Sequence, residues 1–230
     1  MTSVPETMPT PEAGPGAAQG QFESAYHRLR RDIIDGVYAP REHLVETDAA
    51  RELGVSRATV RAVLLRLQQD GLVEIQPNRG ARVRSFSPDE TAKIMRVREV
   101  LEGLAASLAA EQASAAQLAA LRTVVEQMEA ALAAGDLLTL RGLNSQFHRV
   151  IVDAADSAFV DQILGSLQYP LVRYQLMTIL VPGRKEDALA EHRAILACLE
   201  SRDAAGAECA ARQHVAHVRT TLQQCGLLPL

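Results

Sequence analysis

The sequence has few aromatic residues, few cysteines and no net positive charge, and it lacks any long apolar run. No stretch approaches the roughly 18 apolar residues that a membrane span needs, which excludes a transmembrane protein. The first twenty residues hold no basic segment followed by an apolar one, so we expect no secretory signal. Cys198, Cys209 and Cys225 form no CxxC pair and cannot all pair internally, which fits a reducing cytoplasm. We expect Cys198 and Cys209 to be small core residues.

The formal net charge of −4 disfavours a nucleic-acid partner only if the charge is evenly spread. It is not, because residues 55–84 hold six arginines against two acids, whereas residues 85–230 hold 13 basic and 17 acidic residues. A local basic patch is what a phosphate backbone attracts, although a patch of this size is also common on a solvated protein face.

The first third of the chain predicts a helix followed by a helix–turn–helix. Residues 1–20 are rich in Pro and Gly and predict a disordered tail. Apolar residues then recur at helical spacing from Gln21 to about Asp35. A short helix is expected over Glu46–Leu53, and Ser56 is the predicted N-cap of a second one.

Two short strands follow that second helix. Residues 72–75 (LVEI) and 81–84 (ARVR) are predicted to form these strands, around a turn at residues 77–80. Residues 21–85 are therefore predicted to form a winged helix–turn–helix domain, with three helices and a β-hairpin wing.

The remainder of the chain shows the sequence patterns of helices only. Ser87-Pro88-Asp89-Glu90 has the pattern of a helix start, with Ser at the N-cap, Pro next and Glu at the third helical position. Helix boundaries are expected near Ser114, Gly135-Asp136, Ala155-Asp156, Pro182-Gly183 and Arg202-Asp203. Residues 86–226 are thus predicted to form an all-α bundle of six helices, so that the whole chain is mainly α.

The start of the second helix of the helix–turn–helix is the predicted DNA-reading surface, because this helix enters the major groove. Arg57 and Arg61 lie four residues apart on one face, where an arginine can chelate guanine O6 and N7. Ser56 and Thr59 are expected to contact phosphates, and Arg79 at the wing tip to contact the minor groove or the backbone. The alternative is that the two helix arginines only solvate an amphipathic helix.

The segment GVSRATVRAVLLRLQQDGLVEIQPNRGARV resembles the winged-helix domain of the GntR superfamily of bacterial transcription regulators, and LRRDIIDGVYAPREHLVE resembles that family's first helix and turn. The resemblance covers roughly residues 22–84. Arg41 stands where the turn of the family usually has Gly, and Ala62 where the recognition helix usually has Glu. Thr47 replaces a basic residue, which implies an altered operator.

Four of the six histidines lie in the helical half, and two of them are predicted to face its core. His192 and His214 fall within apolar stripes, and Asn144 and His148 border another. Three imidazoles and one amide oxygen from three helices would suit a divalent cation. Each histidine taken alone is more often a packed core residue.

The segments NSQFHRVI, AEHRAIL and RQHVAHV resemble the metal-binding segments of the FadR-type (FCD) effector domain, found in one branch of the GntR superfamily. That resemblance assigns Asn144, His148, His192 and His214 as metal ligands, with zinc or nickel as the metal. Asn144 takes the place of a usual Asp, which implies weaker binding, and His217 matches no ligand position.

Arg98 lies in the apolar stripe of the first bundle helix, one turn before Glu102. An inward guanidinium needs an anionic partner, so Arg98 either pairs with Glu102 or another core acid, or binds the carboxylate of an effector. Arg141, Arg173 and Tyr174 are further candidates for effector contacts.

These observations predict a cytoplasmic, ligand-responsive transcription regulator, a repressor in most of this family. It would bind a near-palindromic double-stranded DNA operator as a homodimer and respond to a small organic acid bound in the helical domain, with no membrane partner. A metal-dependent hydrolase with a DNA-binding appendage is disfavoured because no HExxH or comparable carboxylate stands beside the histidines. A DNA-binding protein without an effector, whose histidines only pack, is the third possibility.

Overall fold

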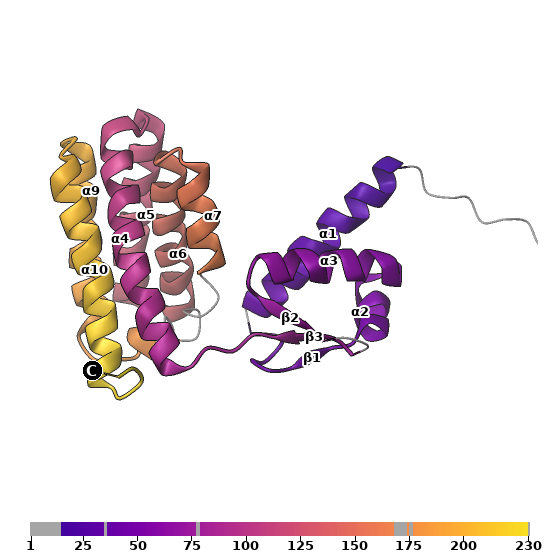
Figure 1. Ribbon diagram of the computed structural model, residues 1–230. Helices are drawn as coiled ribbons and strands as arrows, with labels where there is room; N and C mark the ends of the chain where they lie inside the picture. The colour runs from indigo at the N-terminus through magenta and orange to yellow at the C-terminus, as the bar shows by residue number, and fades with distance from the viewer. Residues whose placement is uncertain (1–14, 35, 77–78, 168–173, 175–176, 230) are drawn as a thin grey trace, which may run out of the picture. The chain divides into compact units, whose positions relative to one another are not determined.

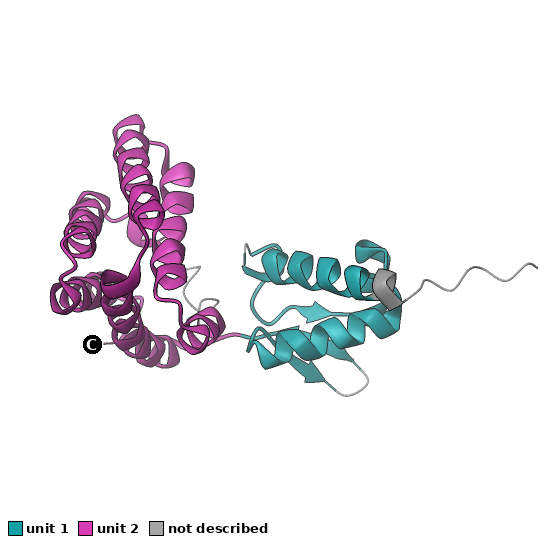
Figure 2. Ribbon diagram, turned by 90° about the horizontal axis from the view of Figure 1, so that it is seen from above, with its two compact units in different colours: residues 1–84 teal, residues 85–230 magenta. Residues whose placement is uncertain are grey.

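The chain divides between Arg84 and Ser85 into two compact units, one residue before the predicted boundary (Figure 2). The computed structural model describes residues 15–34, 36–76, 79–167, 174 and 177–229. The first unit carries the predicted winged helix–turn–helix and the second carries the helical bundle, so the chain is mainly α as predicted.

The elements of the first unit follow the predicted order. They are α1 (Pro15–Ile34), β1 (His43–Leu44), α2 (Glu46–Leu53), α3 (Arg57–Gln69), β2 (Val73–Gln76) and β3 (Gly80–Val83). The bounds of α2 match the prediction, and Ser56 is the N-cap of α3.

Helix α1 begins six residues before its predicted start. Residues 15–20, placed in the disordered tail by the sequence, are helical, whereas residues 1–14 lie outside the described residues. The physical reason is composition, because Pro is tolerated in the first turn of a helix and the next residues include two alanines and a glutamine, which are good helix formers. The high Pro and Gly content of residues 1–20 led to the prediction of disorder for this short helical segment.

The core of the first unit is the apolar face of α3 packed on α1. Val60, Val63 and Leu67 are completely buried, and Leu29 and Ile33 of α1 are 1% exposed. This face was predicted from the spacing of apolar residues in α3, and the structure confirms it.

The wing is a three-stranded antiparallel sheet with the order β1-β3-β2, instead of the two-stranded hairpin predicted. Strand β1 pairs with β3, with His43 opposite Arg82. Two residues are too few to show an alternating pattern, which is why periodicity did not predict β1. At Gly80, φ is +84° and a Cβ would lie 2.3 Å from the carbonyl oxygen of Leu44, so the pairing of β1 with β3 requires glycine here.

Arg41 adopts the left-handed backbone conformation with φ of 71°. This is the turn position at which Gly was expected from the family resemblance. The conformation is held by the backbone, because the Arg41 amide donates to the Val83 carbonyl at 2.9 Å and its own carbonyl accepts from Arg82 Nε at 2.9 Å. A left-handed residue with a side chain costs about 1–2 kcal/mol.

Among the described residues, the second unit contains six helices, α4 to α7, α9 and α10, which lie side by side (Figure 1). They are α4 (Pro88–Gln112), α5 (Ala115–Ala134), α6 (Leu137–Ala154), α7 (Ala158–Ser166), α9 (Arg184–Glu200) and α10 (Ala204–Gln224). Capping boxes at Ser87 and Ser114 begin α4 and α5, as the sequence predicted.

The predicted helix between Asp156 and Pro182 is not continuous. Helix α7 ends at Ser166, Leu167 is in a turn, and helical backbone is described again at Tyr174 and at residues 177–179. Leu167 is the C-cap residue of α7, so the helix predicted for this stretch ends there.

The bundle core is built from small and aliphatic side chains. Phe147 is completely buried among alanines of α4 and aliphatic residues of α5, α6 and α9, including Leu121, Ile195 and Leu199. This accounts for a sizeable core in a chain with only 3% aromatic residues. Among the described residues, no helix combines the length and apolar character needed to cross a membrane.

Candidate DNA-reading and metal-binding sites

The N-terminus of α3 is held by its own hydroxyl side chains. Ser56 Oγ accepts a hydrogen bond from the Thr59 amide at 3.1 Å, and the two hydroxyls lie 2.9 Å apart. Ser56 thus satisfies one of the free amides at the start of the helix. The cap fixes the start of α3 and leaves the next residues, Arg57 and Arg61, on its exposed surface.

Arg57 and Arg61 share a carboxylate partner in α2 that the sequence analysis missed. Both arginine side chains are at least 60% exposed. Arg61 Nε donates to both oxygens of Glu46 at 2.9 and 2.8 Å, and Arg57 Nη2 lies 3.6 Å from the same carboxylate. The two arginines predicted to read DNA therefore lie on one exposed face and share Glu46 as a carboxylate partner.

Arg79 lies at the tip of the wing, between β2 and β3, and is exposed. Its amide donates to the carbonyl of Gln76 at 3.1 Å, which closes the turn. Pro77 and Asn78, the other predicted turn residues, lie outside the described residues.

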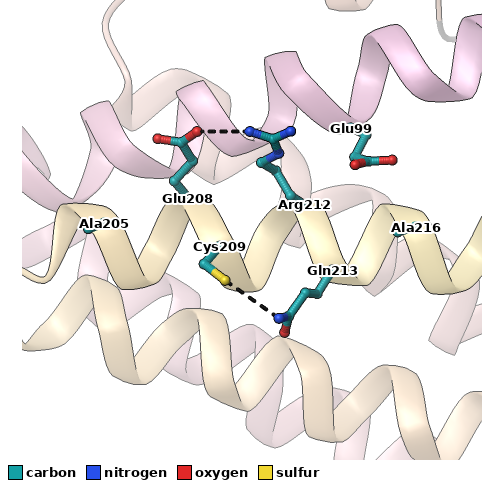
Figure 3. Close-up of a pocket in the computed structure, with 7 residues that line it drawn as sticks. All are labelled: Glu99, Ala205, Glu208, Cys209, Arg212, Gln213 and Ala216. Carbon is teal, nitrogen blue, oxygen red and sulfur yellow. Dashed lines mark hydrogen bonds and ion pairs between the residues drawn. The ribbon is translucent and has the colours of Figure 1, made fainter.

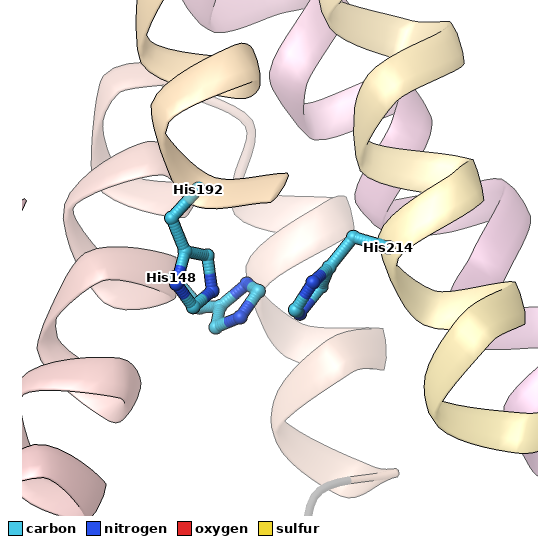
Figure 4. Close-up of side chains that lie close together, drawn as sticks. All are labelled: His148, His192 and His214. Carbon is cyan, nitrogen blue, oxygen red and sulfur yellow. The ribbon is translucent and has the colours of Figure 1, made fainter. Parts of the chain in front are cut away.

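Three histidines from three helices meet inside the bundle (Figure 4). His148 comes from α6, His192 from α9 and His214 from α10. One ring nitrogen from each lies within 4.8 Å of the other two, and the ring centroids are 4.7–5.4 Å apart. His192 and His214 are 2% and 5% exposed, so the structure confirms that they face the core.

Two glutamates stand behind the histidine cluster. His214 Nδ1 lies 2.7 Å from Glu191 Oε2, and His148 Nδ1 lies 3.2 Å from Glu102 Oε2. A carboxylate on Nδ1 fixes the orientation of the ring and leaves Nε2 available, an arrangement common behind metal-bound histidines. The buried Nε2 of His192 has no hydrogen-bond partner in the described part of the chain. These donors fit a divalent cation that accepts imidazole nitrogen.

The charge states of these groups also suit a cation. Burial, followed by the charges of the other two histidines, lowers the pKa of His192 well below its ordinary value. Burial also lowers the pKa of His214, against the opposing effect of Glu191. Burial disfavours the ionised form of Glu102, but Arg98 and His148 outweigh it and hold its pKa far below the usual range. Neutral imidazoles beside ionised carboxylates are the states that metal binding requires.

The fourth predicted ligand, Asn144, lies half-buried on α6, one turn before His148. Residues four apart on a helix share a face, so Asn144 lies on the side of α6 that carries His148.

Arg98 is paired with Glu102, the first of its two predicted alternatives. Arg98 Nε donates to Glu102 Oε1 at 2.9 Å, and the two side chains are 13% and 9% exposed. Through the other oxygen of Glu102, this pair is linked to His148. Arg98 is therefore connected to the histidine cluster through one carboxylate.

The other three candidates for effector contacts are not brought together in the described structure. Arg141 is half-buried on α6, and Tyr174 is buried in a separate apolar cluster with Met95, Val215, Leu222 and Leu228. Arg173 lies outside the described residues.

A separate pocket of about 440 Å³ opens on the surface of α4 and α10 (Figure 3). Glu208 and Arg212 form an ion pair of 3.3 Å at this pocket, and Gln213 contacts Cys209. None of the three clustered histidines lines it. Cys209 is exposed and Cys198 half-buried, so the prediction that Cys209 is a core residue was wrong. Alanines at 207 and 211 take the buried face of α10 instead.

Sequence reasoning missed three charged residues that organise the sites, namely Glu46, Glu191 and Arg184. Glu46 and Glu191 each stand within a predicted helix, and nothing in the periodicity identifies their partners. Arg184 Nη2 donates to Glu191 Oε2 at 2.8 Å, so it adjoins His214. An arginine directly after Pro182-Gly183 at a helix start was the available sign, because a cation is unfavourable at that end of a helix.

Two protein-family models match the chain. The model described as "Bacterial regulatory proteins, gntR family" matches residues 21–83, and the FCD domain model matches residues 93–217. The first covers the winged helix–turn–helix and the second covers all three clustered histidines.

Curated relatives carry the names of transcription regulators. An HTH-type transcriptional regulator of Agrobacterium vitis is 37% identical over 142 residues, which span 60% of this chain and 83% of the relative. The HTH-type transcriptional repressor RspR of Escherichia coli is 27% identical over 88% of this chain and 89% of its own. A probable D-xylose utilization operon transcriptional repressor of Paenarthrobacter nicotinovorans is 31% identical over 74% of this chain and 75% of its own.

Solved structures share the fold. E. coli McbR/YncC superimposes with a TM-score of 0.74 at 21% identity, covering 89% of this chain and 98% of that one. A GntR regulator of Rhodococcus sp. RHA1 gives a TM-score of 0.63 at 23% identity, covering 90% and 98%.

Proposed function

The chain belongs to the gntR family of bacterial regulatory proteins and carries an FCD domain, and from this premise we propose that it is a ligand-responsive repressor acting on a near-palindromic operator. The families and the relatives are transcription regulators and not enzymes, so the hydrolase alternative falls away. A DNA-binding regulator of this kind acts in the cytoplasm. The observation that carries the proposal is the exposed pair Arg57 and Arg61 at the capped start of α3.

In this proposal, Arg57 and Arg61 contact base edges in the major groove. Ser56 and Thr59 contact phosphates, and Arg79 contacts the minor groove or the backbone. The exposure of the three arginines supports these roles. The hydrogen bonds to Glu46 restrict the side-chain conformations of Arg61 before DNA binds, which reduces the side-chain entropy lost on binding.

A homodimer is proposed because a palindromic site needs two reading heads. Helix α4 offers an apolar stripe for the contact, since Val97, Val100 and Leu104 are 48%, 51% and 41% exposed. These residues lie three and four apart, so they form one face of the helix. Three exposed aliphatic side chains in a row favour burial against a second copy.

The FCD domain is proposed to hold zinc or nickel through Asn144, His148, His192 and His214. The bound cation would supply a positive charge for a small organic acid, while Glu102 and Glu191 orient the histidines. Arg98, Arg141, Arg173 and Tyr174 remain proposed contacts of that acid. An effector changes DNA binding only if its affinity differs between the DNA-bound and free conformations.

The test is a gel-shift titration of the purified protein with DNA from the region upstream of its own gene. The wild type is expected to shift this DNA, and a variant with Arg57→Ala and Arg61→Ala is expected to lose the shift. A variant with Arg149→Ala and Arg193→Ala serves as the matched control, because it removes two exposed, ion-paired arginines from the other unit. Equal DNA binding by all three proteins would contradict the proposal.

A further inference from the structure

Arg184, the first residue of α9, is a buried cation with most of its hydrogen-bonding capacity unused. Its side chain is 7% exposed, and Nη2 donates to Glu191 at 2.8 Å. Its Nε and Nη1 atoms are also buried, and neither has a hydrogen-bond partner among the described residues. A guanidinium carries five N–H donors and stays charged, so leaving donors unpaired in the interior is costly. This cost favours a second anionic partner in addition to Glu191.

The free donors of Arg184 lie beside the histidine cluster. The same oxygen of Glu191 accepts from Arg184 and contacts His214 Nδ1 at 2.7 Å. The ring centroids of His192 and His214 are 4.7 Å apart. The partnerless Nε and Nη1 of Arg184 and the partnerless Nε2 of His192 therefore occupy the same part of the bundle.

Two other arginines of the bundle have their partners within the chain. Arg98 is bound by Glu102, and Arg202 donates to the backbone carbonyls of Ala110 and Ala113 at 3.1 and 2.6 Å. Arg184 differs because Glu191 satisfies a single nitrogen.

We propose that Arg184 is the anchor for the carboxylate of the effector, which it binds through the N–H groups of Nε and Nη1 next to His192 and His214. This inference rests on the proposed function for the existence of an effector, and it names the residue that selects for an acid. A carboxylate group, with one negative charge, is favoured over a phosphate, which carries more. Glu191 already offsets part of the positive charge of Arg184, and the charge that remains suits a singly charged group.

The experiment compares the zinc-loaded full chain with its Arg184→Met, Arg184→Lys and Arg193→Met variants. Arg193 is the matched control because it lies on the same helix, exposed and paired with Glu129. Thermal denaturation and calorimetric titration use succinate, citrate and D-glucuronate as probes, with uncharged succinamide and inorganic phosphate as references. Zinc content is measured for every protein, and each melting shift is referred to the same variant without probe.

We expect at least one carboxylate to raise the melting temperature of the wild type, whereas succinamide and phosphate do not. Its affinity should fall about tenfold to a hundredfold in Arg184→Met, which matches the loss of charged hydrogen bonds. Arg193→Met should bind like the wild type. Arg184→Lys, which keeps the charge but loses the planar donor set, should lie between them. Zinc content should stay unchanged throughout.

An unchanged carboxylate affinity in Arg184→Met would overturn the inference, while zinc and DNA binding by the wild type would still support the proposed regulator. Stabilisation by phosphate instead of carboxylates would also overturn it. If no carboxylate stabilises the wild type, the effector and the anchor both fail, and the gel shift reports on DNA binding separately. Should Arg184→Met not fold, Arg184→Lys decides, and wild-type affinity in that variant would reject the assignment.

Discussion

Glu46 in α2 accepts hydrogen bonds from Arg61 Nε in α3 on both of its carboxylate oxygens, at 2.9 and 2.8 Å. The carboxylate is 20% exposed, whereas the arginine side chain is 62% exposed. The acid is therefore set back and the cation projects from the surface. If α3 reads DNA as proposed, this arrangement fixes the direction of Arg61 before binding and also places a negative charge close to the DNA phosphates.

Replacing Glu46 with Gln should raise affinity for non-specific DNA and lower discrimination. Removing one negative charge strengthens attraction to phosphates, while an unfixed Arg61 reads a guanine less well. We expect the ratio of operator to scrambled-DNA affinity to fall roughly tenfold, about 1.4 kcal/mol. Fluorescence anisotropy with both DNAs over a range of salt concentrations measures this ratio.

The control for Glu46→Gln is Asp48→Asn. This change removes an acid from the same helix whose partner is Arg51, three residues along. Asp48→Asn should leave the affinity ratio as in the wild type. A Glu46→Gln variant with unchanged discrimination would show that the pairing with Arg61 has no part in DNA reading.

Asn144 should determine how tightly the cluster holds its metal. A carboxylate oxygen attracts a divalent cation more strongly than an amide oxygen, so Asn144→Asp is expected to bind zinc about tenfold more tightly. Asn144→Ala should bind zinc more weakly than the wild type. Competition with a chromophoric chelator gives the three affinities, and identical values would remove Asn144 from the ligand set.

Metal removal should destabilise the helical unit. Zinc at 100 times its dissociation constant would contribute about 2.7 kcal/mol, or roughly 5–10 °C in melting temperature for a unit of this size. Chelation should therefore lower the melting temperature of the wild type by that amount. His192→Ala should melt at the same temperature with and without chelator.

His217→Ala is the matched control for metal loss. His217 is 60% exposed and contacts Glu191 at 2.8 Å, but it is not among the clustered histidines. This variant should keep the full response to the chelator. A wild type that melts identically in both conditions would favour histidines that only pack.

The apolar stripe on α4 predicts a dimer that one charge disrupts. Val100→Glu places a carboxylate among Val97 and Leu104, and its burial in an interface without a partner would cost several kcal/mol. Sedimentation velocity should then show a monomer. Phe159→Glu is the control, because Phe159 is 80% exposed and lies on a different helix, α7. A dimer that survives Val100→Glu would place the interface elsewhere.

The fold was largely predictable because local chemistry determines it. Ser56, Ser87 and Ser114 begin helices where the capping pattern predicts, and the stripe from Val60 to Leu67 is buried as its spacing requires. Strand β1 was not predictable, since two residues carry no pattern and its pairing with β3 spans nearly forty residues. The start of α1 was missed because residues 15–20 follow a Pro-rich segment.

The candidate sites were predictable only in part. Helical spacing put His192 and His214 in the core, and the resemblance grouped them with His148. The carboxylates were missed because their contacts join different helices. Glu191 reaches His214 across 23 residues, and Glu46 reaches Arg61 across 15. Pairings of this kind depend on tertiary packing, which neither periodicity nor capping specifies.

Gly80 in the wing and Gly36 after α1 should separate the cost of a steric contact from the cost of backbone conformation. Gly36 and Gly80 have φ of +79° and +84°, but a Cβ at Gly36 would meet nothing within 4 Å, whereas one at Gly80 would lie 2.3 Å from the Leu44 carbonyl oxygen. Gly36→Ala should therefore cost about 1 kcal/mol in free energy of unfolding, from backbone strain alone. Gly80→Ala should cost more than about 2 kcal/mol, because β1 must separate from β3.

Arg41→Gly completes this comparison, because it should reverse the same backbone strain. Glycine relieves about 1–2 kcal/mol of left-handed strain but adds about 0.5–1 kcal/mol of entropy to the unfolded chain, so a net gain of about 0.5–1 kcal/mol is expected. The backbone hydrogen bond from Arg41 to Val83 is retained. Urea denaturation of the three variants measures these differences. Equal losses of unfolding free energy for Gly36→Ala and Gly80→Ala would contradict the role of the Leu44 contact. A loss for Arg41→Gly would contradict the strain at residue 41.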